Sequence, residues 1–304
     1  MPEPLAAAQK FGMPRAIGEV LQQIATQFRA AGLDTPARDA RLLVSAALGL
    51  SPVDAIARPE TPVPAEAVTR IEAFAHRRLA REPVSRILGM RQFYGLDLEI
   101  GPATLDPRPE TETLVDAALE LVRGGLVPGR DAPRILDLGT GSGAIVITLL
   151  NALPAAQGLA TDIDEAALSV ARRNALRHGV ENRVQFAAVP WLGGLVGPFD
   201  LIVSNPPYIP SCQIDGLDAE VAFYDPRRAL DGGMDGLEAY RRIIGSAGAA
   251  LAPGGWLALE IGAGQENDVS RLAAKAENSF SEGPLRQWLD LAGLIRCVAF
   301  QARP

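Results

Sequence analysis

The chain has 304 residues, of which 48% are hydrophobic, and its formal net charge is -7 at pH 7. This length allows one or two sizeable cores, with two domains as the better expectation, and the acidic balance argues against a protein whose main surface binds a nucleic acid backbone. Only two cysteines and two histidines occur, without a CxxC pair, so the sequence predicts no metal site.

The first 85 residues carry a helical pattern. Apolar residues recur at helical spacing, as in Ile17, Leu21, Ile24, Ala25 and Phe28. Prolines and glycines interrupt the pattern, so residues 1–85 are expected to form a small helical bundle, either structural or used to dock a macromolecular partner. The N-terminus has no basic region followed by an apolar one, and no apolar run reaches about 18 residues. We therefore expect a soluble, cytoplasmic protein.

Residues 86–105 change to short β-like pieces, 91–95 and 96–100, which predict a hairpin that links two domains. The third segment, 106–304, opens with a proline-stiffened stretch that leads into an expected helix at 110–122. This stretch is either an ordinary capped helix start or a wall of the active site, with Arg108 or Glu110 reaching a ligand.

A glycine-rich loop follows the apolar strand expected at 134–138 and precedes a helix expected at 144–151. The loop consists of Gly139, Thr140, Gly141, Ser142 and Gly143. Its glycines allow the backbone to approach a ligand closely and to turn into the helix. A phosphate-binding P-loop is excluded because the loop has no lysine, whereas a dinucleotide fingerprint is weak but stays open, since Ala144 is an allowed third member.

Asp137 favours a different ligand. A carboxylate beneath a loop that holds a pyrophosphate would repel it, whereas the same carboxylate would attract a cation such as the α-amino group of a methionine moiety. The sequence therefore predicts an S-adenosylmethionine loop. Asp162 ends the next expected strand, 158–162, about 20 residues beyond the glycines, where an acid can accept both ribose hydroxyls. Trp191, after the strand expected at 184–188, either packs against adenine or belongs to the core.

Asn205, Pro206, Pro207 and Tyr208 follow the apolar strand expected at 199–203, at the edge where α/β sheets bind ligands. Neither proline has an N–H group, so the Asn205 side-chain oxygen and the Pro206 carbonyl are available as two fixed acceptors. Two acceptors suit the NH2 group of a planar amide or of a base, with the Tyr208 ring as a stacking face. The alternative is an ordinary Asx turn.

The remaining chain predicts a long loop at 209–236, which is typical of a lid or a recognition loop. A helix at 237–251, a turn at 253–255 and a strand at 256–262 are expected next. The tail, 265–304, should add a further helix or two and closing strands, such as one at 294–301.

Six motifs in this order resemble the HemK/PrmC family. They are FYG at 93–95, PRPETE at 107–112, DLGTGSGAI at 137–145, SNPPYIP at 204–210, ALDGGMDGLEAYR at 229–241 and LEIGAGQ at 259–265. The resemblance implies an α/β fold of the class I S-adenosylmethionine-dependent methyltransferases, with a Rossmann-like, mostly parallel sheet, a helical N-terminal domain and a linking β-hairpin. It also implies methyl transfer to the side-chain N5 of the glutamine in the GGQ motif of class 1 peptide chain release factors.

The site expected from the motifs has two parts. The cofactor-binding residues are Asp137, Gly139, Thr140, Gly141, Ser142, Gly143, Asp162, Trp191 and Asn205. The substrate-binding residues are Asn205, Pro206, Pro207 and Tyr208, of which Asn205 and Pro206 are the catalytic pair, and no metal is expected.

Three positions depart from the family pattern. Pro190 stands where an acid usually precedes the tryptophan, Asp106 stands where isoleucine is common, and the tail at 277–284 is altered. Two other functions remain open. A DNA adenine-N6 methyltransferase would use the same acceptor pair on a flipped base. A cofactor-binding protein could instead dock release factors without turnover.

Overall fold

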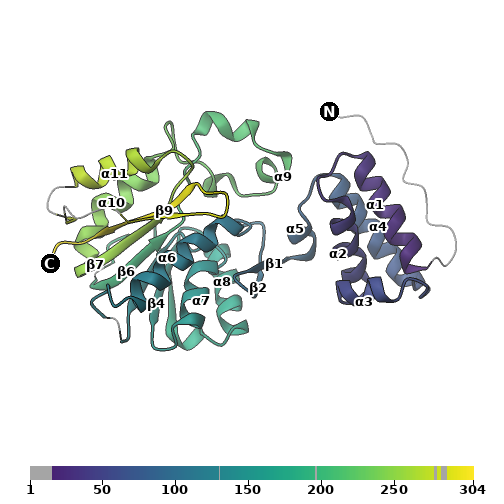
Figure 1. Ribbon diagram of the computed structural model, residues 1–304, viewed down its shortest axis with the longest axis horizontal. Helices are drawn as coiled ribbons and strands as arrows, with labels where there is room; N and C mark the ends of the chain where they lie inside the picture. Colours follow the sequence, from purple (N-terminus) through teal and green to yellow (C-terminus); the bar gives the residue numbers. More distant parts are fainter. Residues whose placement is uncertain (1–15, 130, 196, 277–278, 282–285) are drawn as a thin grey trace. The chain divides into compact units, whose positions relative to one another are not determined.

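The computed structural model describes residues 16–129, 131–195, 197–276, 279–281 and 286–304 (Figure 1). The chain divides into two compact units between Leu88 and Gly89, and each unit is considered by itself. The helices of the first unit are α1 (Ile17–Ala30), α2 (Pro36–Leu48), α3 (Pro52–Ala57), α4 (Ala65–Leu79) and α5 (Val84–Leu88).

The first unit is held together by one apolar cluster and one buried ion pair. Ile24 and Phe28 of α1 are fully buried and belong to the same cluster as Val44 of α2. Arg78 of α4 donates to Asp39 of α2 over 2.8 Å, and both side chains are almost completely buried. Removing either partner would leave an uncompensated buried charge, so this pair fixes α2 against α4.

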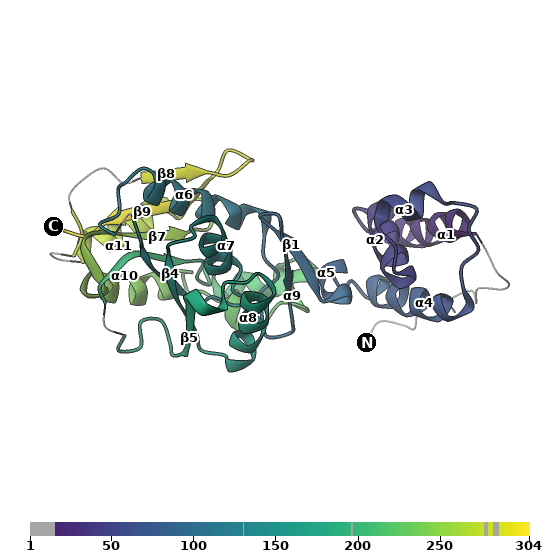
Figure 2. The ribbon, with the colours of Figure 1, turned by 90° about the horizontal axis from the view of Figure 1, so that it is seen from below.

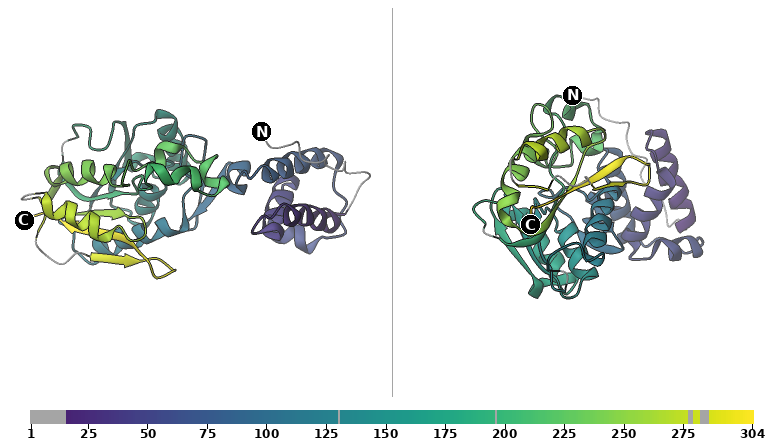
Figure 3. Two further views of the ribbon diagram at one scale, coloured as in Figure 1. Left: turned by 90° about the horizontal axis from the view of Figure 1, so that it is seen from above. Right: turned by 60° about the vertical axis from the view of Figure 1, so that its left-hand side comes forward.

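The second unit contains an antiparallel hairpin and a seven-stranded sheet. The strands are β1 (Met90–Phe93), β2 (Leu96–Glu99), β3 (Arg134–Leu138), β4 (Gln157–Asp162), β5 (Val184–Ala188), β6 (Phe199–Ser204), β7 (Leu251–Glu260), β8 (Arg286–Leu289) and β9 (Ile295–Gln301). The sheet order is β5-β4-β3-β6-β7-β9-β8. The strands from β5 to β7 are parallel, whereas β9 and β8 pair antiparallel at one edge, where Figure 3 draws them in yellow. The predicted mostly parallel sheet is confirmed.

Helices cover both faces of the sheet (Figure 2). The longer ones are α6 (Glu112–Arg123), α7 (Ala144–Ala152), α8 (Glu165–Arg177), α10 (Glu238–Ala250) and α11 (Glu266–Lys275). One core cluster joins α6, α7 and α8 to the sheet, and another joins α10 and α11 to the opposite face. Every residue of β6 is consequently buried, which explains its apolar run at 201–203. Asp200 in the same strand is buried too and accepts the backbone N–H groups of Gly129 and Arg134.

The turn expected at 253–255 is a local irregularity within β7 and does not separate two elements. Gly254 there takes a left-handed φ of +76°, and the pairing with β6 passes from Leu251 to Trp256. The expected tail helix and closing strands are present as α11, β8 and β9. Of the altered tail at 277–284, residues 277–278 and 282–284 lie outside the described residues.

Asn174 of α8 connects the hairpin to the glycine-rich loop. Its Oδ1 accepts the backbone N–H of Glu99 at 2.7 Å, and its Nδ2 donates to the carbonyls of Glu99 and Ser142, both at 2.9 Å. The side chain is fully buried. Replacing it would leave three backbone groups without these partners.

We expect Asn174→Ala to lower the free energy of unfolding by roughly 2–4 kcal/mol, because each buried unsatisfied polar group costs about 1–3 kcal/mol. Urea denaturation followed by circular dichroism measures the change. Asn182→Ala, at an exposed position, is the matched control and should alter stability by less than about 0.5 kcal/mol. Equal midpoints for the two variants would contradict this account of how the hairpin is held.

Candidate active site

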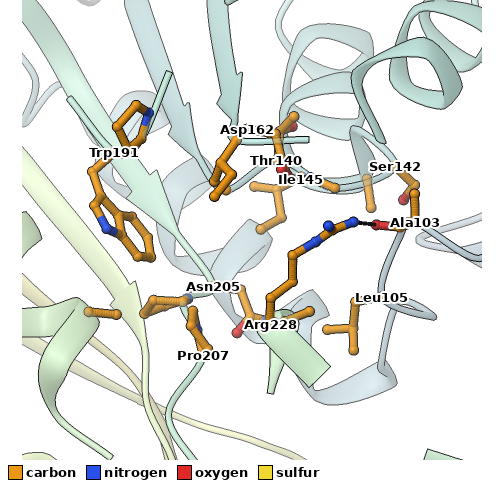
Figure 4. Close-up of a pocket in the computed structure, with 18 of the residues that line it drawn as sticks. Ala103, Leu105, Thr140, Ser142, Ile145, Asp162, Trp191, Asn205, Pro207 and Arg228 are labelled. Carbon is orange, nitrogen blue, oxygen red and sulfur yellow. Dashed lines mark hydrogen bonds between the residues drawn. The ribbon is translucent and has the colours of Figure 1, made fainter. Parts of the chain in front are cut away.

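A cavity of about 360 Å3 opens at the carboxyl ends of the central strands. The sheet order reverses between β3 and β6, and ligands in open α/β sheets bind at such a point. The volume lies within the range of small-molecule sites, on the order of 300–1,000 Å3. The predicted site residues that line it are Gly139, Thr140, Gly141, Ser142, Asp162, Trp191, Asn205, Pro206 and Pro207, several of which are labelled in Figure 4.

The glycine-rich loop lies between β3 and α7. Its conformation requires glycine at position 143, where φ is +82° and an added Cβ would lie 2.6 Å from Cδ1 of Ile147. Gly143 itself is not part of the cavity wall. The loop is tied to β4, since Thr140 N–H donates to the Thr161 carbonyl at 2.8 Å and Gly141 N–H donates to Oδ2 of Asp162 at 3.0 Å. The backbone is thereby fixed close to a ligand.

Asp137 lies beneath this loop and does not line the cavity. Its Oδ2 accepts the Thr140 hydroxyl at 2.6 Å and the Val146 N–H at 3.3 Å, whereas Oδ1 has no hydrogen-bond partner within the described part of the chain. Burial raises the pKa of this carboxyl to about 7, although both hydrogen bonds oppose the increase. Asp137 therefore contacts the underside of the loop and is separated from the cavity by it.

Asp162 lines the cavity at the end of β4. Besides the loop bond from Gly141, its Oδ1 accepts the Asp164 N–H at 2.9 Å, so the carboxylate is held in one orientation. Burial raises its pKa, and the hydrogen bond from Gly141 opposes this increase. Trp191 also lines the cavity, where its indole ring is drawn in Figure 4. The backbone of Trp191 has a left-handed φ of +48°. Pro190 also lines the cavity.

Asn205 follows the end of β6, whose last residue is fixed by the Ser204 hydroxyl donating to the Leu138 carbonyl at 2.7 Å. The Asn205 Nδ2 donates to the Thr111 hydroxyl oxygen at 3.1 Å. In this amide orientation Oδ1 is left as an acceptor for a ligand. Pro206 and Pro207 continue the same cavity wall.

Tyr208 lies apart from the rest of this group. It is not among the lining residues, and its hydroxyl donates to Oε1 of Glu260 at 3.4 Å. Burial and the nearby Glu260 carboxylate raise the pKa of Tyr208 well above its ordinary value. Its carbonyl accepts Nε2 of Gln265 at 3.0 Å, so both ends of the residue are engaged behind the cavity wall.

The stiff segment before α6 contributes other residues than those expected. Leu105, Pro107 and Thr111 line the cavity, whereas Arg108 and Glu110 do not. Arg108 pairs instead with Asp225 of the long loop. The only sequence signal for Thr111 was its place in the PRPETE motif. The unusual Asp106 is buried, and the guanidinium of Arg91 lies 3.4 Å from its carboxylate.

Arg228 lines the cavity, and apart from the length of its loop no sequence pattern pointed to this residue. The loop 209–236 contains three short helical turns, η3 (Ser211–Gly216), α9 (Ala219–Ala222) and η4 (Arg227–Ala229). The Arg228 guanidinium donates to the Ala103 carbonyl at 3.3 Å and to the Asp164 carboxylate (Figure 4). These contacts attach the loop to both sides of the cavity and place a cation on its wall.

Among the described residues, no group of three or more His, Cys, Asp or Glu side chains could hold a metal ion. None of the helices in the described ranges is long and apolar enough to cross a membrane.

Known proteins match both units. Residues 19–89 match the PrmC N-terminal domain family, and residues 113–268 match the methyltransferase small domain family. The release factor glutamine methyltransferase of Rhodospirillum rubrum is 47% identical over 94% of this chain and 85% of its own length. The protein of the same name from Bradyrhizobium diazoefficiens is 45% identical over 95% and 96% of the two chains.

Solved structures agree on the fold. The hMettl16 catalytic domain, in complex with the MAT2A 3'UTR hairpin 6, superposes with a TM-score of 0.55 at 17% identity, covering 79% of this chain and 84% of that one. At this identity the likeness concerns the fold alone. It confirms the predicted class I methyltransferase fold, and the relatives confirm the resemblance that the six motifs indicated.

Proposed function

The chain belongs to the release factor glutamine methyltransferase family, and on this premise we propose that it transfers a methyl group from S-adenosylmethionine to the side-chain N5 of the glutamine in the GGQ motif of class 1 peptide chain release factors. The products are N5-methylglutamine and S-adenosylhomocysteine. The release factor is thus the protein substrate, and the working location is the cytoplasm. Neither base methylation nor docking without turnover is favoured by the relatives.

One observation supports this proposal: Asn205, Pro206 and Pro207 line the same cavity as the glycine-rich loop. Asn205 offers Oδ1, Pro206 offers its carbonyl, and neither Pro206 nor Pro207 has an N–H group. A glutamine NH2 group has two hydrogens to donate. Binding both hydrogens fixes the plane of the amide and the direction in which its nitrogen faces the cofactor side of the cavity.

The mechanism relies on alignment. An amide nitrogen is a poor nucleophile because its lone pair is delocalised, and S-adenosylmethionine supplies an electrophilic methyl group on a sulfonium. Acceptors at Asn205 and Pro206 increase the electron density on the nitrogen and hold it in line with that methyl group. After the N–C bond has formed, the nitrogen loses a proton and becomes a neutral secondary amide. Well-oriented reactants of this kind gain about 7 kcal/mol or more in favourable cases.

The cofactor is held by the residues on the other side of the cavity. Gly139, Thr140, Gly141, Ser142 and Gly143 supply the loop backbone. Asp162 accepts the ribose hydroxyls, Trp191 packs against the adenine, and Asp137 attracts the α-amino group from beneath the loop. The Asp137 carboxyl beneath the loop and the Asp162 carboxyl on the cavity wall suit a ligand that is cationic at one end.

We expect Asp162→Ala to weaken the binding of S-adenosylmethionine about tenfold to a hundredfold, because two ribose hydroxyls lose a charged acceptor and hydrogen bonds to charged groups contribute about 1.5–3 kcal/mol. Isothermal titration calorimetry measures the dissociation constant. Asp34→Ala removes the same charge from the exposed surface of the first unit and should leave affinity unchanged. An Asp162→Ala protein with wild-type affinity would remove this residue from the cofactor site.

Each of the three segments of the chain has its own task in this proposal. The helical segment 1–85 docks the release factor, the hairpin at 86–105 links it to the catalytic part, and residues 106–304 perform the methyl transfer. The match of residues 19–89 to a domain family shared with such methyltransferases supports a common role for the first segment.

Transfer of labelled methyl from S-adenosylmethionine to a purified release factor tests the function. The same factor with its GGQ glutamine changed to alanine and a DNA duplex serve as parallel acceptors. Label on the intact factor alone supports the proposal. Label on the duplex would establish base methylation instead, and cofactor binding without any transfer would contradict an enzymatic role.

A further inference from the structure

The orientation of the Asn205 amide decides whether the site works. With Oδ1 toward the cavity, the side chain accepts a hydrogen from the glutamine NH2 group. Rotated by 180°, it would present its own NH2 group, and two donors would face each other. Some other residue must therefore distinguish the two ends of this amide, since its oxygen and nitrogen have nearly the same size and shape.

Thr111 is the residue in contact with the other end. Its hydroxyl oxygen accepts Nδ2 of Asn205 at 3.1 Å, although the two residues are 94 positions apart in sequence. Thr111 is only 3% exposed and lies in the short helical turn η1 (Pro109–Thr111), directly before α6. A hydroxyl has one hydrogen to donate and can also accept. By itself it could serve either orientation of the amide.

Glu260 removes this ambiguity. It ends β7, its side chain is 1% exposed, and its Oε2 has no hydrogen-bond partner within the described ranges. The Thr111 hydroxyl lowers the pKa of this carboxyl, against the larger effect of burial. An ionised carboxylate can only accept. When Thr111 donates its single hydrogen to Glu260, its oxygen is left to accept, and only the Nδ2 end of Asn205 fits.

We propose that Thr111 and Glu260 are positioning residues, which hold the Asn205 amide with Oδ1 facing the methyl-accepting nitrogen. This inference rests on the proposed glutamine methylation and adds to it two residues that act through Asn205. Asn205 Nδ2 donates to the Thr111 hydroxyl oxygen, and in this proposal the Thr111 hydroxyl hydrogen is directed to the nearby Glu260 carboxylate. Asn205 follows β6, Thr111 ends η1 and Glu260 ends β7, so three separate elements place these side chains.

In this proposal the ionisation of Glu260 controls the direction in which hydrogen bonds are donated between Asn205, Thr111 and Glu260. The groups that act on Glu260 are the hydroxyls of Thr111 and Tyr208, the guanidinium of Arg296 in β9 and the carboxyl of Glu110 in η1. The Glu260 charge in turn raises the pKa values of Tyr240 and Cys297. Burial raises the pKa of Glu260 to about 7, with Thr111, Arg296 and Tyr208 opposing. A protonated Glu260 can donate to Thr111, which then can donate to Asn205 and favour the rotated amide. Turnover at saturating cofactor should therefore fall as the pH decreases through about 7.

The test compares steady-state methylation of the release factor by four variants at saturating S-adenosylmethionine. Thr111→Val removes the hydroxyl but keeps the shape, Thr111→Ser restores it, and Glu260→Gln replaces the acceptor by a group that can also donate. Thr148→Val is the matched control, because Thr148 is equally buried and its hydroxyl donates only to the Ala144 carbonyl within α7.

We expect kcat to fall roughly 10- to 100-fold for Thr111→Val and for Glu260→Gln, corresponding to the loss of one well-placed hydrogen bond in the transition state. Cofactor affinity should change less than about twofold, Thr111→Ser should recover most of kcat, and Glu260→Gln should lose the decline in kcat near pH 7. Equal kcat for Thr111→Val and Thr148→Val would overturn the proposal. An inactive wild type would instead contradict the proposed function, so the two failures are distinguishable.

Discussion

Replacing Asn205 by alanine is expected to lower kcat for release factor methylation about 100- to 1,000-fold, the range found when one preorganised hydrogen-bonding group is removed from an active site. The substrate amide would lose the acceptor that fixes its plane, while the Pro206 carbonyl would still hold one hydrogen. The Thr111 hydroxyl would also lose the Nδ2 partner that it has at 3.1 Å. The rate should therefore change far more than the binding of S-adenosylmethionine.

Single-turnover methylation with enzyme in excess isolates this chemical step, and calorimetry on the same protein measures cofactor affinity. Asn182→Ala, which removes an exposed asparagine amide outside the cavity, should retain the full single-turnover rate. A variant at position 205 with a wild-type rate would show that the Pro206 carbonyl and the shape of the cavity are sufficient. A large loss of cofactor affinity with an unchanged rate would make Asn205 a cofactor-binding residue only.

The parts of this fold that sequence could predict are those with a strong local pattern. Residues 199–203 are apolar except for Asp200, and two prolines follow at 206 and 207, so both the buried strand and its carboxyl end could be placed. Glycines 139, 141 and 143 all have positive φ, and no other residue takes this backbone so readily. Local chemistry was sufficient in both cases.

The contacts that orient the site come from residues distant in sequence, and a pattern cannot reveal them. Thr111 reaches Asn205 across 94 positions, Tyr208 reaches Glu260 across 52, and Arg228 reaches Ala103 across 125. The predicted role of Tyr208 as a stacking face is not tested by these contacts. Tyr208 continues the acceptor sequence, yet its hydroxyl points to Glu260 and its ring does not line the cavity.

The second large effect concerns Asp137, whose buried carboxyl is expected to couple cofactor binding to pH. Its pKa in the folded protein is about 7, above the ordinary value near 3.9 that it has in the unfolded chain. The folded state without ligand therefore binds a proton more tightly than the unfolded state does. The contribution of this group to stability is complete below about pH 4 and is lost as the pH rises toward 7. A cationic ligand above the loop favours the ionised form and lowers this pKa, so binding should release protons.

We expect the affinity for S-adenosylmethionine to increase as the pH rises from 6 to 8, with release of a fraction of a proton near pH 7. Asp137→Asn should abolish both effects and weaken binding at pH 8 about 10- to 100-fold, because the attraction between opposite charges is lost. Titrations in buffers of different ionisation enthalpy measure the released protons. Glu260→Gln removes another buried carboxyl with a pKa of about 7 and should keep most of the pH dependence.

The same Asp137→Asn protein should be more stable than the wild type at pH 8 when no cofactor is present, by a few kcal/mol, since each pKa unit corresponds to about 1.4 kcal/mol. At pH 8 the Asp137→Asn substitution would thus increase the stability of the free protein while it weakens the binding of S-adenosylmethionine. Thermal unfolding at pH 5 and pH 8 checks this, because the difference between the two proteins should shrink at the lower pH. A variant that loses stability and affinity together would show instead that Asp137 serves the loop only through its hydrogen bonds to Thr140 and Val146.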